Sequence, residues 1–105
     1  MSKKRKKIKF SISGKTVDGK LVVGGVYDIT ETYGVPLDML LITLDESDLV
    51  IDWIDYYETA LKSGMKSDRI LERIKYNIRD IYGVDYSKYV ITTLKYHIKR
   101  VREVI

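Results

Sequence analysis

The chain has no cysteine, and it is poor in several other residue types. Its 105 residues contain no Gln, a single Asn (Asn77), a single Ala (Ala60) and a single Pro (Pro36). Without cysteine, disulfide bonds and thiolate metal sites are excluded. Scarcity of the thermolabile residues Asn, Gln and Cys is typical of thermophiles. An AT-rich genome would also enrich Ile, Lys and Tyr but would raise Asn as well, so a thermophilic source is favoured.

Long hydrophobic runs are also missing. No apolar stretch approaches the roughly 20 residues that a membrane-spanning helix needs. The basic start is followed by an alternating segment, which differs from the apolar core of a signal peptide. The sequence therefore predicts a cytoplasmic protein with no membrane partner, located in the host cytoplasm if the source is a virus.

The length and the 45% apolar content predict one compact domain over residues 8–105, preceded by a flexible basic arm at residues 1–7. The periodicity of the apolar residues predicts the fold class. It is α+β and mainly helical, with an N-terminal β-hairpin followed by four or five short helices packed on one core.

The hairpin is predicted from a change in periodicity. Apolar and polar residues alternate over 8–13, which predicts a strand with one apolar face. Asp18-Gly19 is a turn dipeptide, and the β-branched stretch 21–27 supplies the second strand. Gly24-Gly25 predicts a bulge or bend there. A lone hairpin is marginal in water, so it must pack on the helices or pair with a partner.

Three helices are expected in the middle of the chain. A short one covers residues 28–34, and a second starts near Pro36 and ends near Leu44. Residues 37–44 fit a buried strand as well, because short apolar runs are ambiguous. Residues 46–63 are predicted to form the clearest helix, stopped by Gly64.

Two further helices complete the chain. The first begins at an N-cap at Ser67, ends at Gly83 and has a core row made of Ile70, Ile74, Ile78 and Ile81. The last runs from about Ser87 to the end, and its apolar residues repeat at spacings of three and four: Ile91, Leu94, Ile98, Val101 and Ile105. This seam is expected to pack on the neighbouring helix or on a second copy, as a homodimer.

Signatures of catalysis are weak throughout. Gly14-Lys15-Thr16 follows a strand, but the phosphate-binding motif requires a glycine at position 9, which is Lys9. His97 is the only histidine, and no nucleophile is matched to it. Residues 28–41 resemble a DNA-binding helix–turn–helix, but the second helix is apolar and acidic and has no residue that reads bases. The sequence therefore predicts a protein that is not an enzyme and has no cofactor or metal.

Three aspartates, Asp48, Asp52 and Asp55, are predicted to share one face of the helix over 46–63. No Lys or Arg lies between residues 21 and 61 to relieve their repulsion. A solvated acidic face is one interpretation, and the site of a metal-dependent nuclease is another. We predict a docking face for a basic protein partner or for a second copy.

The charge is strongly polarised along the chain. Residues 1–20 carry eight Lys/Arg and one Asp, a net charge of +7, whereas residues 21–61 carry a net charge of −9. Residues 62–105 carry a net charge of +6, and the whole chain +4. A basic start and a basic end suit binding to a polyanion.

Basic residues on the last helix form a stripe with spacings of four and three, made of Lys88, Thr92, Lys95, Lys99 and Arg102, with Arg100 beside it. Tyr89 and Tyr96 are predicted on the same exposed side. Cations interleaved with aromatic rings suit a nucleic acid whose bases can stack. An ordinary solvated face that pairs with the acidic helix fits the same pattern.

The N-terminal segment is the most basic part of the chain, with cations at Lys3, Lys4, Arg5, Lys6, Lys7 and Lys9. Such a run binds phosphates by releasing counterions, without sequence preference. We therefore predict a small non-enzymatic protein that binds DNA or RNA through the arm and the last helix. The alternative is an oligomeric structural or interaction protein that uses its acidic middle, for example a component of an archaeal virus or an inhibitor of a host factor.

Overall fold

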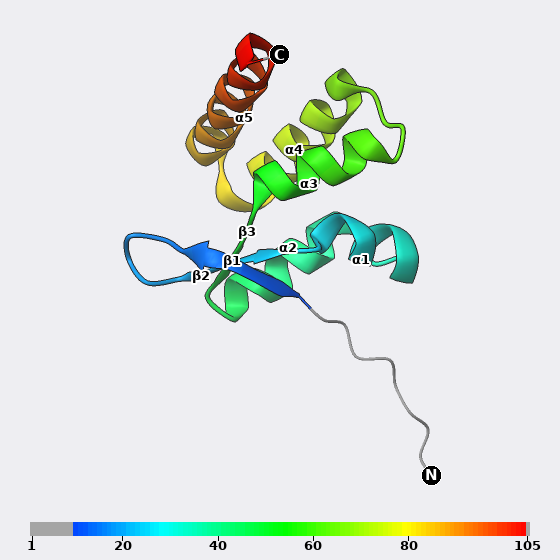
Figure 1. Ribbon diagram of the computed structural model, residues 1–105. Helices are drawn as coiled ribbons and strands as arrows, with labels where there is room; N and C mark the ends of the chain where they lie inside the picture. Colours follow the sequence, from blue (N-terminus) through cyan, green and yellow to red (C-terminus); the bar gives the residue numbers. More distant parts are fainter. Residues whose placement is uncertain (1–9, 105) are drawn as a thin grey trace.

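The computed structural model describes residues 10–104, with side chains as far as Val101. Within this range it contains three strands and five helices, which confirms the predicted mainly helical α+β fold. Their bounds are β1 (Ser11–Lys15), β2 (Leu21–Gly24), α1 (Val26–Tyr33), α2 (Leu37–Glu46), β3 (Leu49–Ile51), α3 (Trp53–Lys62), α4 (Ser67–Tyr82) and α5 (Val84–Val104). In Figure 1, α3, α4 and α5 occupy the upper half of the view, and the sheet, α1 and α2 the lower half.

The predicted hairpin is present, but its irregularity lies in the other strand. β1 and β2 pair antiparallel, and the register shifts between Ile12 and Gly14. Gly24 continues the regular pairing, and an added Cβ there would lie 2.9 Å from Ser11 Oγ. Gly25 has φ 81°, a conformation that favours glycine, and leads directly into α1. The two glycines thus serve close packing and a helix start. Of the predicted bulge or bend, the bulge is not at these glycines, and the chain changes from strand to helix at Gly25.

A third strand was missed by the sequence prediction. β3 pairs in parallel with β2, so that Val23 lies opposite Ile51, and α1 and α2 form the connection between the two strands. The single helix predicted over residues 46–63 is therefore wrong. It is interrupted at Asp48, which adopts φ 59°, and a new helix starts after Asp52. The apolar run 49–51 is more stable as a strand than as a helix, because its backbone groups form hydrogen bonds with those of β2.

The other helices follow the prediction closely. α1 has Gly34 as its C-cap, as predicted, but it starts at Val26, two residues before the predicted start and inside the stretch 21–27 that was predicted as a strand. Residues 37–44 are helical rather than extended. α4 starts one residue earlier than predicted, with Lys66 and not Ser67 at the N-cap position. α5 starts at Val84, three residues before the predicted Ser87.

The core forms where α3, α4 and α5 meet the sheet and α2. Three isoleucines of the predicted row in α4, Ile70, Ile74 and Ile78, have no exposed surface, and Ile81 is partly buried. Leu94 on α5 is also fully buried, while Val101 near the end of the same seam is 40% exposed. The seam of α5 therefore packs mainly against its own chain, with α4 as its principal neighbour.

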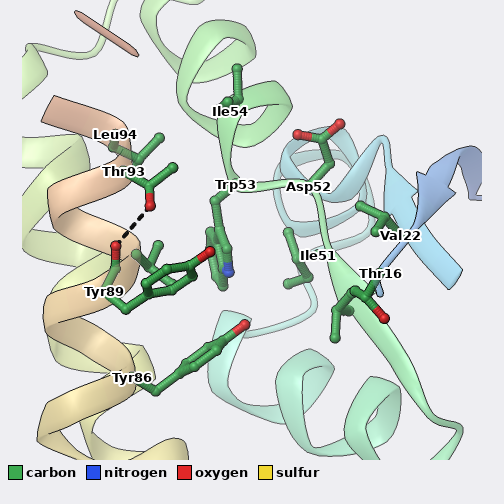
Figure 2. Close-up of a pocket in the computed structure, with 12 residues that line it drawn as sticks. Thr16, Val22, Ile51, Asp52, Trp53, Ile54, Tyr86, Tyr89, Thr93 and Leu94 are labelled. Atoms are coloured by element: carbon green, nitrogen blue, oxygen red, sulfur yellow. Dashed lines mark hydrogen bonds between the residues drawn. The ribbon is translucent and has the colours of Figure 1, made fainter. Parts of the chain in front are cut away.

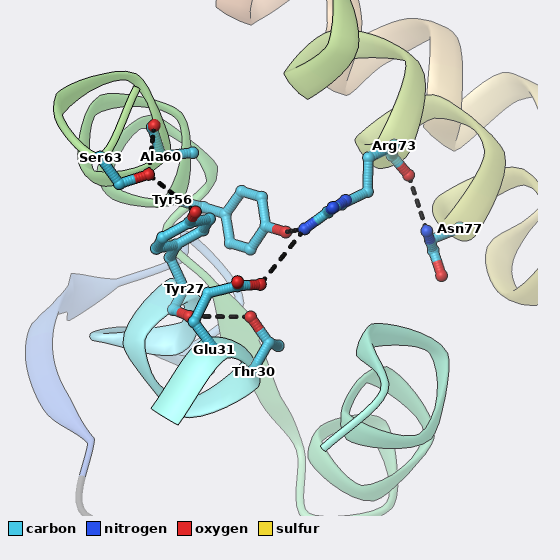
Figure 3. A network of polar contacts seen from close by, with 8 residues as sticks. All are labelled: Tyr27, Thr30, Glu31, Tyr56, Ala60, Ser63, Arg73 and Asn77. Atoms are coloured by element: carbon cyan, nitrogen blue, oxygen red, sulfur yellow. Dashed lines mark hydrogen bonds and ion pairs between the residues drawn. The ribbon is translucent and has the colours of Figure 1, made fainter. Parts of the chain in front are cut away.

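Polar contacts tie α1, α3 and α4 together inside this arrangement (Figure 3). The Arg73 guanidinium lies 3.5 Å from both the Tyr56 hydroxyl and a Glu31 carboxylate oxygen. Burial raises the pKa of Tyr56, and the hydrogen bond to Tyr56 raises the pKa of Arg73. The Tyr27 hydroxyl lies 2.8 Å from Ser63 Oγ. These contacts use Arg73 internally and leave it less free for a ligand.

No helix within the described range has the length and apolar character of a membrane span.

Candidate nucleic-acid interface

A surface groove lined by charged residues lies between α4 and α5 and has a volume of about 800 Å³. The two helices are joined at Gly83 and lie next to each other over much of their length. Ser87, at the base of this groove, is buried, and its hydroxyl donates a hydrogen bond to the Lys75 carbonyl oxygen at 3.0 Å. This bond fixes the start of α5 against the middle of α4. The remaining lining residues are Asp68, Leu71, Glu72, Lys75, Arg79, Val84, Lys88, Ile91, Thr92 and Lys95.

Four cations line the groove, two from each helix: Lys75, Arg79, Lys88 and Lys95. All four are exposed. Among residues 10–101, none of them lies within 4.0 Å of a carboxylate oxygen, whereas Arg73 and His97 each have a carboxylate partner. The positive charge of the groove is therefore not neutralised by close ion pairs, and it is open to an anionic ligand.

The positive charge is concentrated at the Gly83 end. Lys75 and Arg79 lie in the second half of α4, and Lys88 lies in the first turns of α5. The two lining carboxylates, Asp68 and Glu72, come from the first half of α4. The Tyr76 ring is 46% exposed, with Arg79 4.7 Å and Lys75 5.6 Å from its centroid. An exposed ring flanked by two cations adds a surface on which a base can stack.

The structure brings together only part of the predicted basic site. Lys88 and Lys95 line the groove, while Lys99 and Arg100 are exposed farther along α5. Arg100 lies 5.8 Å from the centroid of the Tyr96 ring. The Arg102 side chain and the arm cations Lys3, Lys4, Arg5, Lys6, Lys7 and Lys9 lie outside the described residues. Sequence analysis did not identify Lys75 and Arg79, although their spacing of four on an amphipathic helix was a usable signal.

The three aspartates predicted to form a docking face do not share a helix face. Asp48 lies in the turn before β3. Asp52 is the N-cap of α3 and accepts a hydrogen bond from the Asp55 backbone N–H at 3.0 Å. An Asp55 carboxylate oxygen in turn accepts from the Gly25 backbone N–H at 2.9 Å. Two of the three carboxylates therefore have structural roles. No group of three His, Cys, Asp or Glu within residues 10–101 is placed to hold a metal ion.

The contact between Asp55 and Gly25 joins the start of α3 to the start of α1. Asp55→Ala is expected to lower the free energy of unfolding by about 1–3 kcal/mol, because the Gly25 N–H then loses its acceptor in a half-buried site. Urea denaturation followed by far-ultraviolet circular dichroism measures the change. The matched control is Asp45→Ala at an exposed position of α2, expected within about 0.5 kcal/mol of wild type. Equal stabilities of the two variants would contradict a structural role for Asp55.

His97 also has a structural partner. Its Nε2 lies 2.8 Å from a Glu58 carboxylate oxygen and connects α5 to α3. The side chain of His97 is 25% exposed. No nucleophilic side chain is bonded to the imidazole among the described residues, and His97 is a boundary residue of α5 that contacts α3 through Glu58.

An aromatic cavity lies on the other side of α5 and has a volume of about 230 Å³ (Figure 2). Its walls come from the sheet, the start of α3 and the first turns of α5. Tyr86 and Tyr89 reach from α5 toward Trp53 of α3. The cavity is lined by Thr16, Val22, Val50, Ile51, Asp52, Trp53, Ile54, Tyr86, Tyr89, Val90, Thr93 and Leu94. A second cavity of about 160 Å³ shares Val50, Ile51, Trp53 and Tyr86 with it.

The tyrosines beside the cavity are arranged as a row. The ring centroids of Tyr82 and Tyr86 lie 5.2 Å apart, and those of Tyr86 and Tyr89 lie 6.3 Å apart. Burial raises the pKa of Tyr86 and raises the pKa of Tyr82 to about 12, with the nearby Asp45 carboxylate adding to the effect at Tyr82. Both phenols therefore stay neutral at physiological pH, and these two rings carry no negative charge.

The chain was compared with models of known protein families, with curated proteins and with solved structures, and no match was found.

Proposed function

We propose that this protein is a small non-enzymatic nucleic-acid-binding protein whose affinity is mainly electrostatic and whose sequence selectivity is low. The observation that carries the proposal is the groove between α4 and α5, where Lys75, Arg79 and Lys88 converge without close carboxylate partners in the described part of the chain. The arm, with its six cations at positions 3–9, is a second source of positive charge in the same chain.

Electrostatics and chemistry both favour a phosphate backbone as the ligand. Each neutralised phosphate releases condensed counterions, which makes cation clusters of this kind effective against a polyanion. Lys and Arg side chains contact phosphates without reading sequence. The two polar side chains that complete the groove, Thr92 and Ser87, add hydroxyl groups, although that of Ser87 is already engaged with the Lys75 carbonyl. Nothing in the groove offers the side-chain amides that read adenine edges.

Replacing Lys75, Arg79 and Lys88 together by Gln tests the groove. The triple variant is expected to bind single-stranded or duplex oligonucleotides more weakly, and the log–log salt slope is expected to become shallower by about 2 to 3, because three phosphate contacts are lost. Fluorescence anisotropy of a labelled oligonucleotide between 50 and 300 mM salt, roughly the range over which such contacts are screened, measures both effects.

A matched control removes the same charge elsewhere. Lys62, Lys66 and Arg69 are three exposed cations outside the groove lining. Their replacement by Gln lowers the net charge equally and is expected to leave most of the salt slope intact. If both triple variants lose the same affinity and the same part of the salt slope, net charge alone drives binding, and the groove is not the binding site.

A further inference from the structure

We infer that the aromatic cavity beside α5 is a binding site for an unpaired nucleobase, so that the protein prefers single-stranded over duplex nucleic acid. This inference rests on the proposed function and names the form of its ligand. The site is formed by Trp53, Tyr86 and Tyr89, with Thr16, Asp52 and Thr93 as the polar residues of its lining (Figure 2).

The wall of the cavity is mainly aromatic and aliphatic. Three aromatic rings from two elements border a space of about 230 Å³, and most of the other lining residues are aliphatic. A flat aromatic ring gains most from such a wall, because stacking on aromatic side chains is available to every base. Tyr89 is 67% exposed and Tyr86 is 36% exposed, so both rings remain accessible to a ligand.

The cavity lies close to cations of the basic groove. Lys88 precedes Tyr89 in α5, so the basic groove and the aromatic cavity lie on two flanks of the same helix. A strand that passes over α5 can place its phosphates at Lys88 and Lys95 and turn a base toward Tyr89. A duplex cannot do this, because its bases are paired and stacked within the helix.

The polar lining of the cavity includes one carboxylate, that of Asp52. Asp52 uses one carboxylate oxygen for the Asp55 N–H, and the other has no partner among residues 10–101. In Figure 2 this carboxylate points away from the three rings, so it contributes negative charge near the cavity rather than a contact to a stacked base. This negative charge disfavours a phosphate in the cavity, which orients the nucleotide with its base inward and its phosphate toward Lys88.

Two single-stranded probes with the same number of phosphates separate base stacking from electrostatics. One is a 12-nucleotide strand of mixed sequence, and the other is the abasic strand of equal length. The wild-type protein is expected to bind the strand with bases more tightly by roughly 5- to 150-fold for each stacked base. Trp53 is the only tryptophan of the chain, so its fluorescence reports occupation of the cavity directly. Quenching is expected with the complete strand and not with the abasic strand.

Tyr89→Ala is expected to abolish most of the preference for the complete strand while it leaves the salt slope unchanged. Tyr89→Phe keeps the ring and is expected to keep the preference. The matched control is Tyr96→Ala on the same helix, which removes a ring of similar exposure, 63%, outside the cavity. Because Tyr89 is largely exposed, its replacement removes little core contact and the variant is expected to fold.

Three results would overturn the inference. They are equal affinity of the wild type for the two strands, equal losses in Tyr89→Ala and Tyr96→Ala, and a wild-type dimer in light scattering that Tyr89→Ala dissociates, which would assign the cavity to a second copy. If the wild type binds neither strand at low salt, the proposed function itself fails. Binding to both strands with equal affinity leaves that function standing and removes only the base site.

Discussion

Leu94→Ala is expected to lower the free energy of unfolding by about 2–5 kcal/mol, because it empties a fully buried position. Leu94 belongs to the apolar seam of α5 and packs in the same core as Ile70, Ile74 and Ile78 of α4. Truncation loses the transfer free energy of the side chain and leaves a cavity that the surrounding helices fill only partly. Chemical denaturation at several protein concentrations measures the change.

Val101→Ala is the control from the same seam. Val101 is 40% exposed and lies within the helix, where alanine has a higher helix propensity than valine, so the expected change is within about 0.5 kcal/mol. A large loss at Leu94 that does not depend on protein concentration assigns the seam to the interior of one chain. If stability rises with protein concentration and both variants reduce that dependence, the seam is an interface between copies, as a homodimer would require.

Deletion of residues 2–7 is expected to have the largest effect on binding. It removes five of the nineteen Lys and Arg residues, so the log–log salt slope for a single strand is expected to become shallower by up to about 4. Affinity at 100 mM salt is expected to fall by more than in any single-residue variant. Fluorescence anisotropy over a range of salt concentrations measures both quantities.

A charge-preserving variant is the control for the deletion. Changing Lys3, Lys4, Lys6 and Lys7 to Arg keeps every charge and is expected to preserve the slope, because the contribution of the arm comes from charge alone. A deletion that leaves both slope and affinity unchanged would remove the arm from the mechanism. The groove between α4 and α5 would then be the only proposed binding site for nucleic acid.

The sequence predicted the elements whose periodicity is long and regular. The row Ile70, Ile74 and Ile78 defines α4 over about two turns, and the structure buries all three residues completely. The turn at Asp18-Gly19 was also predictable, because Asp-Gly is a common turn dipeptide. In the structure Gly19 adopts the left-handed conformation, with φ 91°. Such signals are local, so they can be recognised in the sequence without knowledge of the neighbouring elements.

β3 could not be derived in the same way. Its three residues, Leu49, Val50 and Ile51, form an apolar run that fits a helix or a strand equally well. The choice is made by β2, which lies about 25 residues earlier in the chain and pairs with it in parallel. One local signal was available: Asp52 followed by Asp55 resembles the start of a helix, with a capping residue and an acidic first turn.

The candidate site was predictable only on the α5 side. The basic stripe of the last helix contains Lys88 and Lys95, but the groove also needs Lys75 and Arg79 from α4. Which faces of two helices meet depends on their packing, and sequence periodicity within each helix does not determine it. The aromatic cavity was even less predictable, because Trp53 and Tyr89 are distant in sequence and come together only through the fold.

The most direct test is the salt dependence of binding of the unmodified protein to a single-stranded 12-nucleotide probe. With the arm and the groove both engaged, the association constant is expected to fall steeply, with a log–log slope of about −4 or steeper. Unrelated sequences that contain all four bases are expected to give similar affinities, because phosphate contacts and stacking are largely independent of sequence. No binding at 50 mM salt, or binding that does not change across a tenfold rise in salt, would contradict an electrostatic nucleic-acid-binding protein.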